Sequence, residues 1–300
     1  MGDEKGMLNY QYKKGVIRIT ERIGREKGGE ERQKYNSDIL WKMRLLLTRE
    51  EVYSHINSKN TLSLLEPNYL IDLRMSEEEI FKKISRSTRR NIKKAIESDD
   101  FQYVELTSPS DEDIEEFRRV YDDFAVKKNI SECNVRKLKA FRDVGALVIT
   151  FIQDKLGQRL CYQTYFCDGY QAYGMYSVLL ELNSDSINGQ VIGRANKYLD
   201  WRNIQRSKER GCSWYNFGGK IMNPDDLEGQ NVNKYKLSFG AISGYDLRTY
   251  YPISFIGKVF VLLLRMKLRF RKNEEFLFAQ QFKNTEKKVM ELDSLQKELH

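Results

Sequence analysis

The strongest constraint on the fold of this 300-residue chain is a regular succession of secondary-structure signals between residues 101 and 217. A strand pattern is followed by two helical patterns, three strand patterns, a polar loop, a long helical pattern and a further strand. Gly157 and the Asp168-Gly169 pair mark tight turns, so the three middle strands are expected to pair antiparallel. The expected strands are 101–106, 146–153, 159–167, 171–180 and 212–217, and the expected helices are 110–128, 132–144 and 191–210.

The flanking segments predict fewer elements. Strands are expected at 15–23 and 69–75, and the capping-box pair Ser76 and Glu79 opens a helix that should run to about Ser98. After residue 217, the sequence indicates a polar loop at 221–233, a strand at 242–251 and two helices at 255–271 and 274–297.

Composition narrows the chemistry. There are 51 Lys and Arg against 43 Asp and Glu, a net charge of +8, which favours anionic partners if the excess is local and otherwise describes a slightly basic surface. The two histidines and the four cysteines, none in a C-x-x-C pair, argue against a bound metal and against Ser-His or Cys-His catalysis. Because the start of the sequence lacks an apolar leader, the chain is expected in a reducing cytoplasm, with its four cysteines as free thiols.

The element order of residues 101–217 resembles that of the GNAT acyltransferases. At the joint between the fourth strand and the next helix, Gln190-Val-Ile-Gly-Arg-Ala195 is similar to that family's phosphate-binding signature, Q/R-x-x-G-x-G/A. Helix-start N–H groups and the helix dipole attract anions, and Gly193 would let a phosphate approach the backbone. The resemblance implies that Gln190, Gly193, Arg194 and Ala195 bind the donor; the alternative is a glycine-containing helix start without a ligand.

Three further segments resemble the FemAB family of aminoacyltransferases and their GNAT-like relatives. These are Ser87-Thr-Arg-Arg-Asn-Ile-Lys-Lys-Ala95, Gly211-Cys-Ser-Trp-Tyr-Asn-Phe-Gly-Gly219 and Lys234-Tyr-Lys-Leu-Ser-Phe-Gly240. The resemblance implies an α+β, GNAT-like fold with an abbreviated N-terminal GNAT-like lobe at 1–100, a complete lobe at 101–252 and a helical extension at 253–300.

The same resemblance implies an acyl or aminoacyl transfer to an amine. The donor would be acyl-CoA or an aminoacyl-tRNA, with no permanently bound cofactor, and the acceptor would belong to the envelope, either a peptidoglycan precursor or a surface-polysaccharide sugar. Asn216 stands where the family has Asp, and Ser238 where it has Gly. Any carboxylate role at position 216 is therefore lost, and the acceptor stays open.

Site residues follow from these matches. Lys236 would hold the acyl carbonyl oxygen or a phosphate and stabilise the transition-state oxyanion, and Tyr215 would lie beside the cleft as a second catalytic residue. Gly218-Gly219 would allow close approach of the acceptor or of a phosphate. The alternatives are a surface lysine on a sheet edge and a plain turn. The general base is undetermined among five residues: Asp168, Asp225, Asp226, Tyr215 and Tyr235.

Two basic segments suggest anionic partners. Arg86, Arg89 and Arg90 begin a basic helix that could bind the phosphates of tRNA or of the acceptor, or could be a solvated face. Residues 255–272 mix an apolar run with Lys and Arg, for which core packing is favoured over contact with an anionic membrane surface. These features also support a second function class, a non-catalytic module that binds RNA or an anionic surface.

Overall fold

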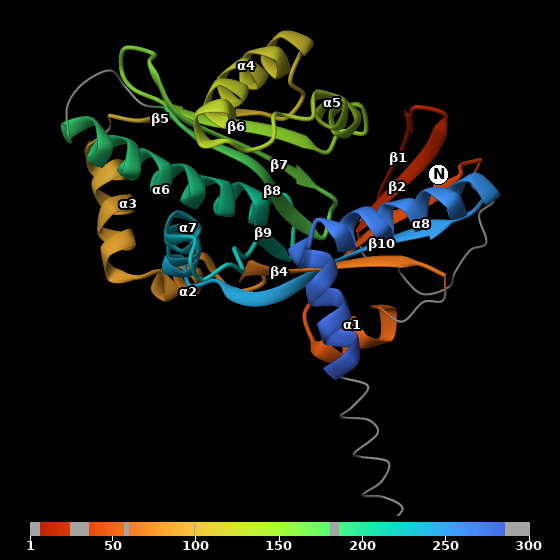
Figure 1. Ribbon diagram of the computed structural model, residues 1–300. Coiled ribbons are helices and arrows are strands. Elements are labelled where there is room, and N and C mark those ends of the chain that lie inside the picture. Colours follow the sequence, from red (N-terminus) through yellow and green to blue (C-terminus); the bar gives the residue numbers. More distant parts are fainter. Residues whose placement is uncertain (1–6, 25–35, 57–59, 99, 181–185, 286–300) are drawn as a thin grey trace, which may run out of the picture. The chain divides into compact units, whose positions relative to one another are not determined.

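The computed structural model describes residues 7–24, 36–56, 60–98, 100–180 and 186–285 (Figure 1). The chain forms two compact units, each built from non-consecutive segments. Unit 1 comprises Met1–Leu8, Tyr69–Gly218 and Leu227–Ile242, and unit 2 comprises Asn9–Asn68, Gly219–Asp226 and Ser243–His300. This division differs from the sequence-based boundaries at 100 and 252, because a single strand, β4 (Leu62–Asp72), carries the chain from one unit into the other.

Unit 1 has the element order expected for a GNAT-like lobe. Its elements are α2 (Glu77–Lys83), α3 (Arg86–Ser98), β5 (Gln102–Leu106), α4 (Asp111–Lys128), α5 (Val135–Asp143), β6 (Leu147–Gln153), β7 (Arg159–Cys167), β8 (Gln171–Leu179), α6 (Ser186–Glu209), β9 (Trp214–Gly219) and α7 (Leu227–Ser238). The strands lie in the order β4-β9-β8-β7-β6-β5. Strands β5 to β8 pair antiparallel and β8 pairs parallel with β9, so the mixed α+β, GNAT-like prediction is confirmed.

Capping residues set several helix ends as the sequence predicts. Ser76 and Ser110 each form a capping box, with Glu79 and Asp113 as the reciprocal partners. Gly211 follows α6 with φ of 81°, a left-handed conformation that suits glycine and ends the helix.

Three helix predictions need correction. The helix expected from Ser76 to Ser98 is broken, because Ile84 is extended and Ser85 starts a new helix by accepting the Thr88 N–H. Helix α6 begins at Ser186, earlier than the expected Val191. The polar loop expected at 221–233 contains the start of α7, which buries the small or polar residues Gly229 and Asn233 and so lacks an apolar periodicity.

The core of unit 1 lies between its helices and the sheet. Helix α3 packs against α6, and their apolar side chains meet strand β9 and the residue that follows α7 (Figure 1). This cluster includes Ile92, Trp201, Ile204, Tyr215 and Phe239. The segments with family resemblance therefore share one core.

Unit 2 contains a second group of strands and helices. Its elements are β1 (Met7–Lys14), β2 (Ile17–Gly24), β3 (Ile39–Leu46), α1 (Arg49–Ile56), β10 (Ile242–Pro252) and α8 (Phe255–Phe270), and residues 274–285 are also helical. Strand order here is β1-β2-β3-β10-β4, with β2 and β3 parallel and β3 and β10 antiparallel. The charged segment 25–36, for which the sequence leaves a loop or a solvated helix open, and the end of the helix expected to reach 297 fall mainly outside the described residues.

Helix α8 forms where predicted but does not pack as predicted. Gly257 and Val261 are its buried residues, whereas Phe255 and Phe270 are 79% and 90% exposed. The prediction that this apolar run packs into the core is therefore wrong for most of its length. None of the described helices has the length and apolar character needed to cross a bilayer.

Candidate active site

The three FemAB-like segments converge within unit 1. Thr88 of α3 donates a hydrogen bond from its hydroxyl to Ser238 Oγ at 3.0 Å, and the Ser85 N–H donates to the Ser238 carbonyl at 2.7 Å. Lys236 Nζ lies 3.4 Å from the Gly218 carbonyl oxygen, to which it donates. Residues far apart in the sequence thus assemble one local site at the end of α7.

Gly240 fixes the end of this assembly. It has φ of 76°, and a Cβ built there would lie 2.7 Å from the Lys83 carbonyl oxygen. We expect Gly240→Ala to lose about 1–2 kcal/mol of unfolding free energy from the dihedral angle and about 1–3 kcal/mol more from the clash. Gly157 is the matched control, because it has a similar φ of 78° and open space around it. Urea denaturation that shows equal losses at both positions would contradict the close approach.

Asp200 of α6 is the most distinctive group at the site. Its side chain is 1% exposed and accepts hydrogen bonds from Gln163 Nε2 at 2.9 Å, from Tyr215 OH at 3.3 Å and from Tyr235 OH. Burial raises the pKa of Asp200 to about 6, although these donors and the Lys236 charge oppose the rise. A carboxyl group with a pKa near neutrality is suited to proton transfer.

Further buried polar groups hold this carboxylate. Asn203 Nδ2 donates to Gln163 Oε1 at 2.7 Å, and Asn196 Nδ2 donates to Tyr235 OH at 2.8 Å. Each member therefore has a fixed orientation, because its hydrogen-bond partners lie on a different element or on another turn of α6. A connected network of this kind defines the direction in which Asp200 and Tyr235 present their oxygen atoms.

Two lysines flank the network. Lys236 on α7 is half-buried and close enough to Asp200 for its charge to lower the carboxyl pKa. Lys197 on α6 donates to the Gly193 carbonyl at 3.2 Å, and its Nζ lies 5.8 Å from the centre of the Tyr235 ring. Burial lowers the pKa of Lys197. Lys197 thus connects Gly193, which belongs to the segment predicted to bind the donor, with Tyr235, the residue before Lys236.

The predicted donor segment lies within α6 and not at its start. Its backbone N–H groups therefore have intrahelical acceptors, which corrects the expectation of free helix-start donors. Gln190 is exposed, Gly193 faces open space and Ala195 is buried. The buried Arg194 Nε has no hydrogen-bond partner among the described residues.

Tyr215, predicted as catalytic, is buried beneath Asp200. Burial raises the pKa of Tyr215 well above its ordinary value, and its hydroxyl is directed to the Asp200 carboxylate. This position suits a residue that orients Asp200. Asn216 is also buried, where its Oδ1 accepts the Gly218 N–H at 2.8 Å and so shapes the turn beside Lys236.

The predicted acceptor residues occupy different environments. Arg86 and Arg90 are exposed on one face of α3, together with Lys93 and Lys94. Arg89 donates to the Lys82 carbonyl at 2.6 Å. Gly218 adjoins Lys236, as described above.

Gly219 is assigned to unit 2 and lies against Glu66 of that unit, since a Cβ on Gly219 would meet the Glu66 carboxylate.

The other candidate bases fit less well. Asp168 is buried, and burial raises its pKa to about 6, but it accepts the N–H groups of Tyr170 and Gln171 and so fixes the β7–β8 turn. Asp225 and Asp226 are exposed in the segment before α7. Sequence reasoning missed Asp200. The available signal was a polar stripe on the otherwise buried face of α6, formed by Asn196, Asp200, Asn203 and Ser207.

Comparisons with known proteins add a resemblance of fold. No family model matches the chain, and no curated protein matches it in sequence. Among solved structures, FemX is similar, with a TM-score of 0.49 and 11% identity over 65% of this chain. The chain spans 64% of the length of FemX.

Two other solved structures cover more of the chain. The C-terminal domain of a protein described as a lysylphosphatidylglycerol synthetase from Agrobacterium fabrum has a TM-score of 0.48 and 11% identity, over 88% of this chain and 86% of its own. L-PGS from Bacillus licheniformis has a TM-score of 0.46 and 12% identity, over 86% and 85%. At these identities and scores, none of the similar structures identifies a donor or an acceptor for this chain.

Proposed function

We propose that unit 1 is an amine acyltransferase whose reaction centre is formed by Lys236, Tyr235 and Asp200. The observation that carries the proposal is that the Lys236 ammonium lies near a buried carboxyl group, that of Asp200, which is hydrogen-bonded to Tyr235 and can accept a proton. Lys236 donates a hydrogen bond to the Gly218 carbonyl and is close enough to Asp200 for its charge to lower the carboxyl pKa, and Tyr235 is hydrogen-bonded to that carboxylate. The GNAT-like element order of unit 1 and the convergence of three FemAB-like segments at this point support it.

The chemistry requires charge stabilisation and removal of one proton. The acceptor amine attacks the carbonyl carbon of a thioester or ester, and the Lys236 ammonium stabilises the oxyanion that forms. The amine gives its proton to the Tyr235 oxygen while the Tyr235 hydroxyl proton passes to Asp200. Collapse of the tetrahedral intermediate breaks the bond to the leaving group, which departs as the CoA thiolate or the ribose alkoxide of the tRNA and takes up the proton that Asp200 returns through Tyr235.

The donor would be an acyl-CoA or an aminoacyl-tRNA, both of which carry phosphate groups. Gln190, Gly193 and Arg194 would contact it on α6, with Lys197 as an additional cation beside Gly193. The exposed cations Arg86 and Arg90 would contact phosphates of a tRNA or of the acceptor. An envelope amine, on a peptidoglycan precursor or a surface-polysaccharide sugar, is the proposed acceptor class.

A direct assay tests the proposal. The full chain is incubated with labelled acyl-CoA or with charged tRNA and a panel of amines, and products are identified by mass spectrometry. We expect stable acylation of an amine with one donor class. Tight binding of uncharged RNA with no acyl transfer from either donor would overturn the proposal and favour the non-catalytic binding module.

Gly193 tests the donor contact. We expect Gly193→Ala to stabilise the chain by about 1 kcal/mol, because α6 gains a better helix former in open space. If donor lies against the backbone here, its KM should rise roughly tenfold, equivalent to about 1.4 kcal/mol. The matched control is Gly189→Ala, four residues earlier on the same face and also open. A larger KM effect at Gly189 would move the donor to the true start of α6.

A further inference from the structure

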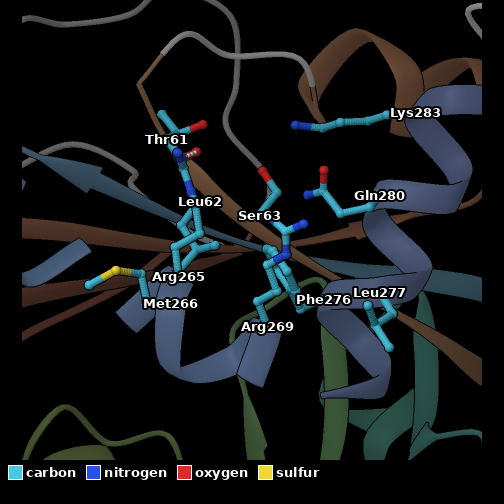
Figure 2. A pocket seen from close by; sticks show the side chains of 10 residues that line it. All are labelled: Thr61, Leu62, Ser63, Arg265, Met266, Arg269, Phe276, Leu277, Gln280 and Lys283. Carbon is cyan, nitrogen blue, oxygen red and sulfur yellow. Dashed lines mark hydrogen bonds between the residues drawn. The ribbon is translucent and has the colours of Figure 1, made fainter. Parts of the chain in front are cut away.

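Unit 2 contains a pocket that the proposed acyl transfer does not use. It has a volume of about 590 Å³ and lies among the start of β4, helix α8 and the helical residues 274–285. Figure 2 shows the ends of the Arg269, Gln280 and Lys283 side chains directed toward the same space as the Ser63 hydroxyl. Side chains from three separate elements therefore converge on one volume.

The lining of this pocket is cationic. Arg265, Arg269 and Lys283 contribute to it, and no acidic residue does so among its lining residues. Arg265 donates to the Thr61 carbonyl at 2.9 Å, which fixes its position at the rim. Burial and the nearby Arg265 charge both lower the pKa of Lys283. Like charges held together in a partly enclosed space would be relieved by a bound anion.

One polar group that lines the pocket, the Ser63 hydroxyl, lacks a hydrogen-bond partner among the described residues. Ser63 is only 2% exposed. A buried hydroxyl without a partner costs free energy unless something supplies the missing bond. The oxygen atoms of one phosphate group could accept from Ser63, from the Gln280 amide and from the Arg269 and Lys283 side chains at once.

The exposed face of α8 adjoins this pocket. Its apolar side chains are those of Phe255, Val259, Leu262, Leu263, Met266 and Phe270, which recur at helical spacing and are all exposed. Lys258, Arg265 and Arg269 follow one edge of this apolar stripe, and Lys267 and Arg271 follow the other. Apolar residues bordered by cations are typical of helices that lie in the interface of an anionic membrane.

Met266 connects the two features, because it belongs to the exposed stripe and also lines the pocket. We infer that α8 lies in the surface of an anionic membrane and that the pocket holds the phosphate of an anionic phospholipid headgroup. The occupant is a lipid because an apolar stripe borders the cationic site, and a soluble phosphate would leave that stripe in water. The basic edges complement the negative surface of such a membrane.

Vesicle flotation with the full chain tests this inference. We expect binding to vesicles of phosphatidylcholine and phosphatidylglycerol but not to phosphatidylcholine alone. The double substitution Leu263→Ser and Phe270→Ser should lower binding at least tenfold, because it removes two exposed apolar side chains from the stripe. Leu156→Ser is the matched control, since Leu156 is 92% exposed in the β6–β7 turn of unit 1 and should not affect binding.

The pocket needs a separate comparison. Lys283→Gln and Lys267→Gln each remove one charge, worth roughly fivefold near an anionic surface, but only Lys283 lines the pocket. We expect Lys283→Gln to lose clearly more vesicle binding than Lys267→Gln. The separate variant Ser63→Ala, which changes no charge, should also lose vesicle binding, and thermal melting checks that each variant is folded. Equal losses of vesicle binding at the two lysines would overturn the proposal that the pocket holds the headgroup phosphate. Stabilisation by inorganic phosphate without any vesicle binding would overturn the membrane assignment.

Discussion

Asp200→Asn should lower acyl transfer by about 10²- to 10⁴-fold, the range expected when a general base is removed. Asparagine has nearly the same shape and can still accept the Tyr235 hydrogen bond, but it cannot take up a proton. The measurement is single-turnover transfer at saturating donor. Asp168→Asn is the matched control, because Asp168 is also a buried carboxyl with a pKa raised to about 6, yet it only fixes a turn. Equal losses in both variants would contradict a catalytic role for Asp200.

The pH dependence gives a second readout of the same group. Because a general base must be ionised, the rate should rise as pH increases through about 6, the raised pKa of Asp200. The residual activity of Asp200→Asn should lack this rise. A wild-type profile that is flat between pH 5 and 8 would exclude Asp200 as the proton acceptor.

Stability should show the opposite trend. The pKa of Asp200 is raised in the folded chain from an ordinary value of 3.8, so the native state binds more protons than the unfolded state between about pH 4 and pH 6. Asp200 therefore contributes less stability as pH rises through this window. The variant lacks this penalty, so at pH 7 it should unfold at the same temperature as the wild type or a higher one.

The sequence predicted unit 1 well because its signals are local. Strand alternation, the Ser76 and Ser110 capping boxes and the glycine after α6 each depend on neighbouring residues. The family-like segments also pointed to Lys236, which the structure places close enough to Asp200 for its charge to lower the carboxyl pKa and whose catalytic role stays a prediction. These features need no knowledge of which elements pack together.

The parts that sequence reasoning missed depend on burial. Asp200 and Asn203 are polar residues on a buried helix face, where they break the apolar pattern that would otherwise mark the core. Helix α7 buries Gly229 and Asn233, so its sequence looks like a loop. The apolar run of α8 looks like core until the structure leaves its side chains exposed. In each case polar residues are buried or apolar residues are exposed, against the usual preference of their residue types. Such exceptions are concentrated at functional sites.

Lys236→Met should lower transfer by about 10²- to 10³-fold, the effect of losing one donor to the transition-state oxyanion. Methionine keeps most of the side-chain volume, so the half-buried site should stay packed and the melting temperature should change little. Lys234→Met is the matched control, because Lys234 is exposed two residues earlier on α7 and faces a different direction. Similar losses for the two lysines would indicate a general effect of charge on substrate attraction.

One readout separates Lys236 from any bystander cation. Its charge lowers the pKa of Asp200, so removal of that charge should move the inflection of the pH–rate profile to higher pH. Lys234→Met should leave the inflection in place. A loss of rate at Lys236 without this shift would mean that the lysine does not act beside Asp200, and the reaction centre proposed for unit 1 would have to be moved elsewhere.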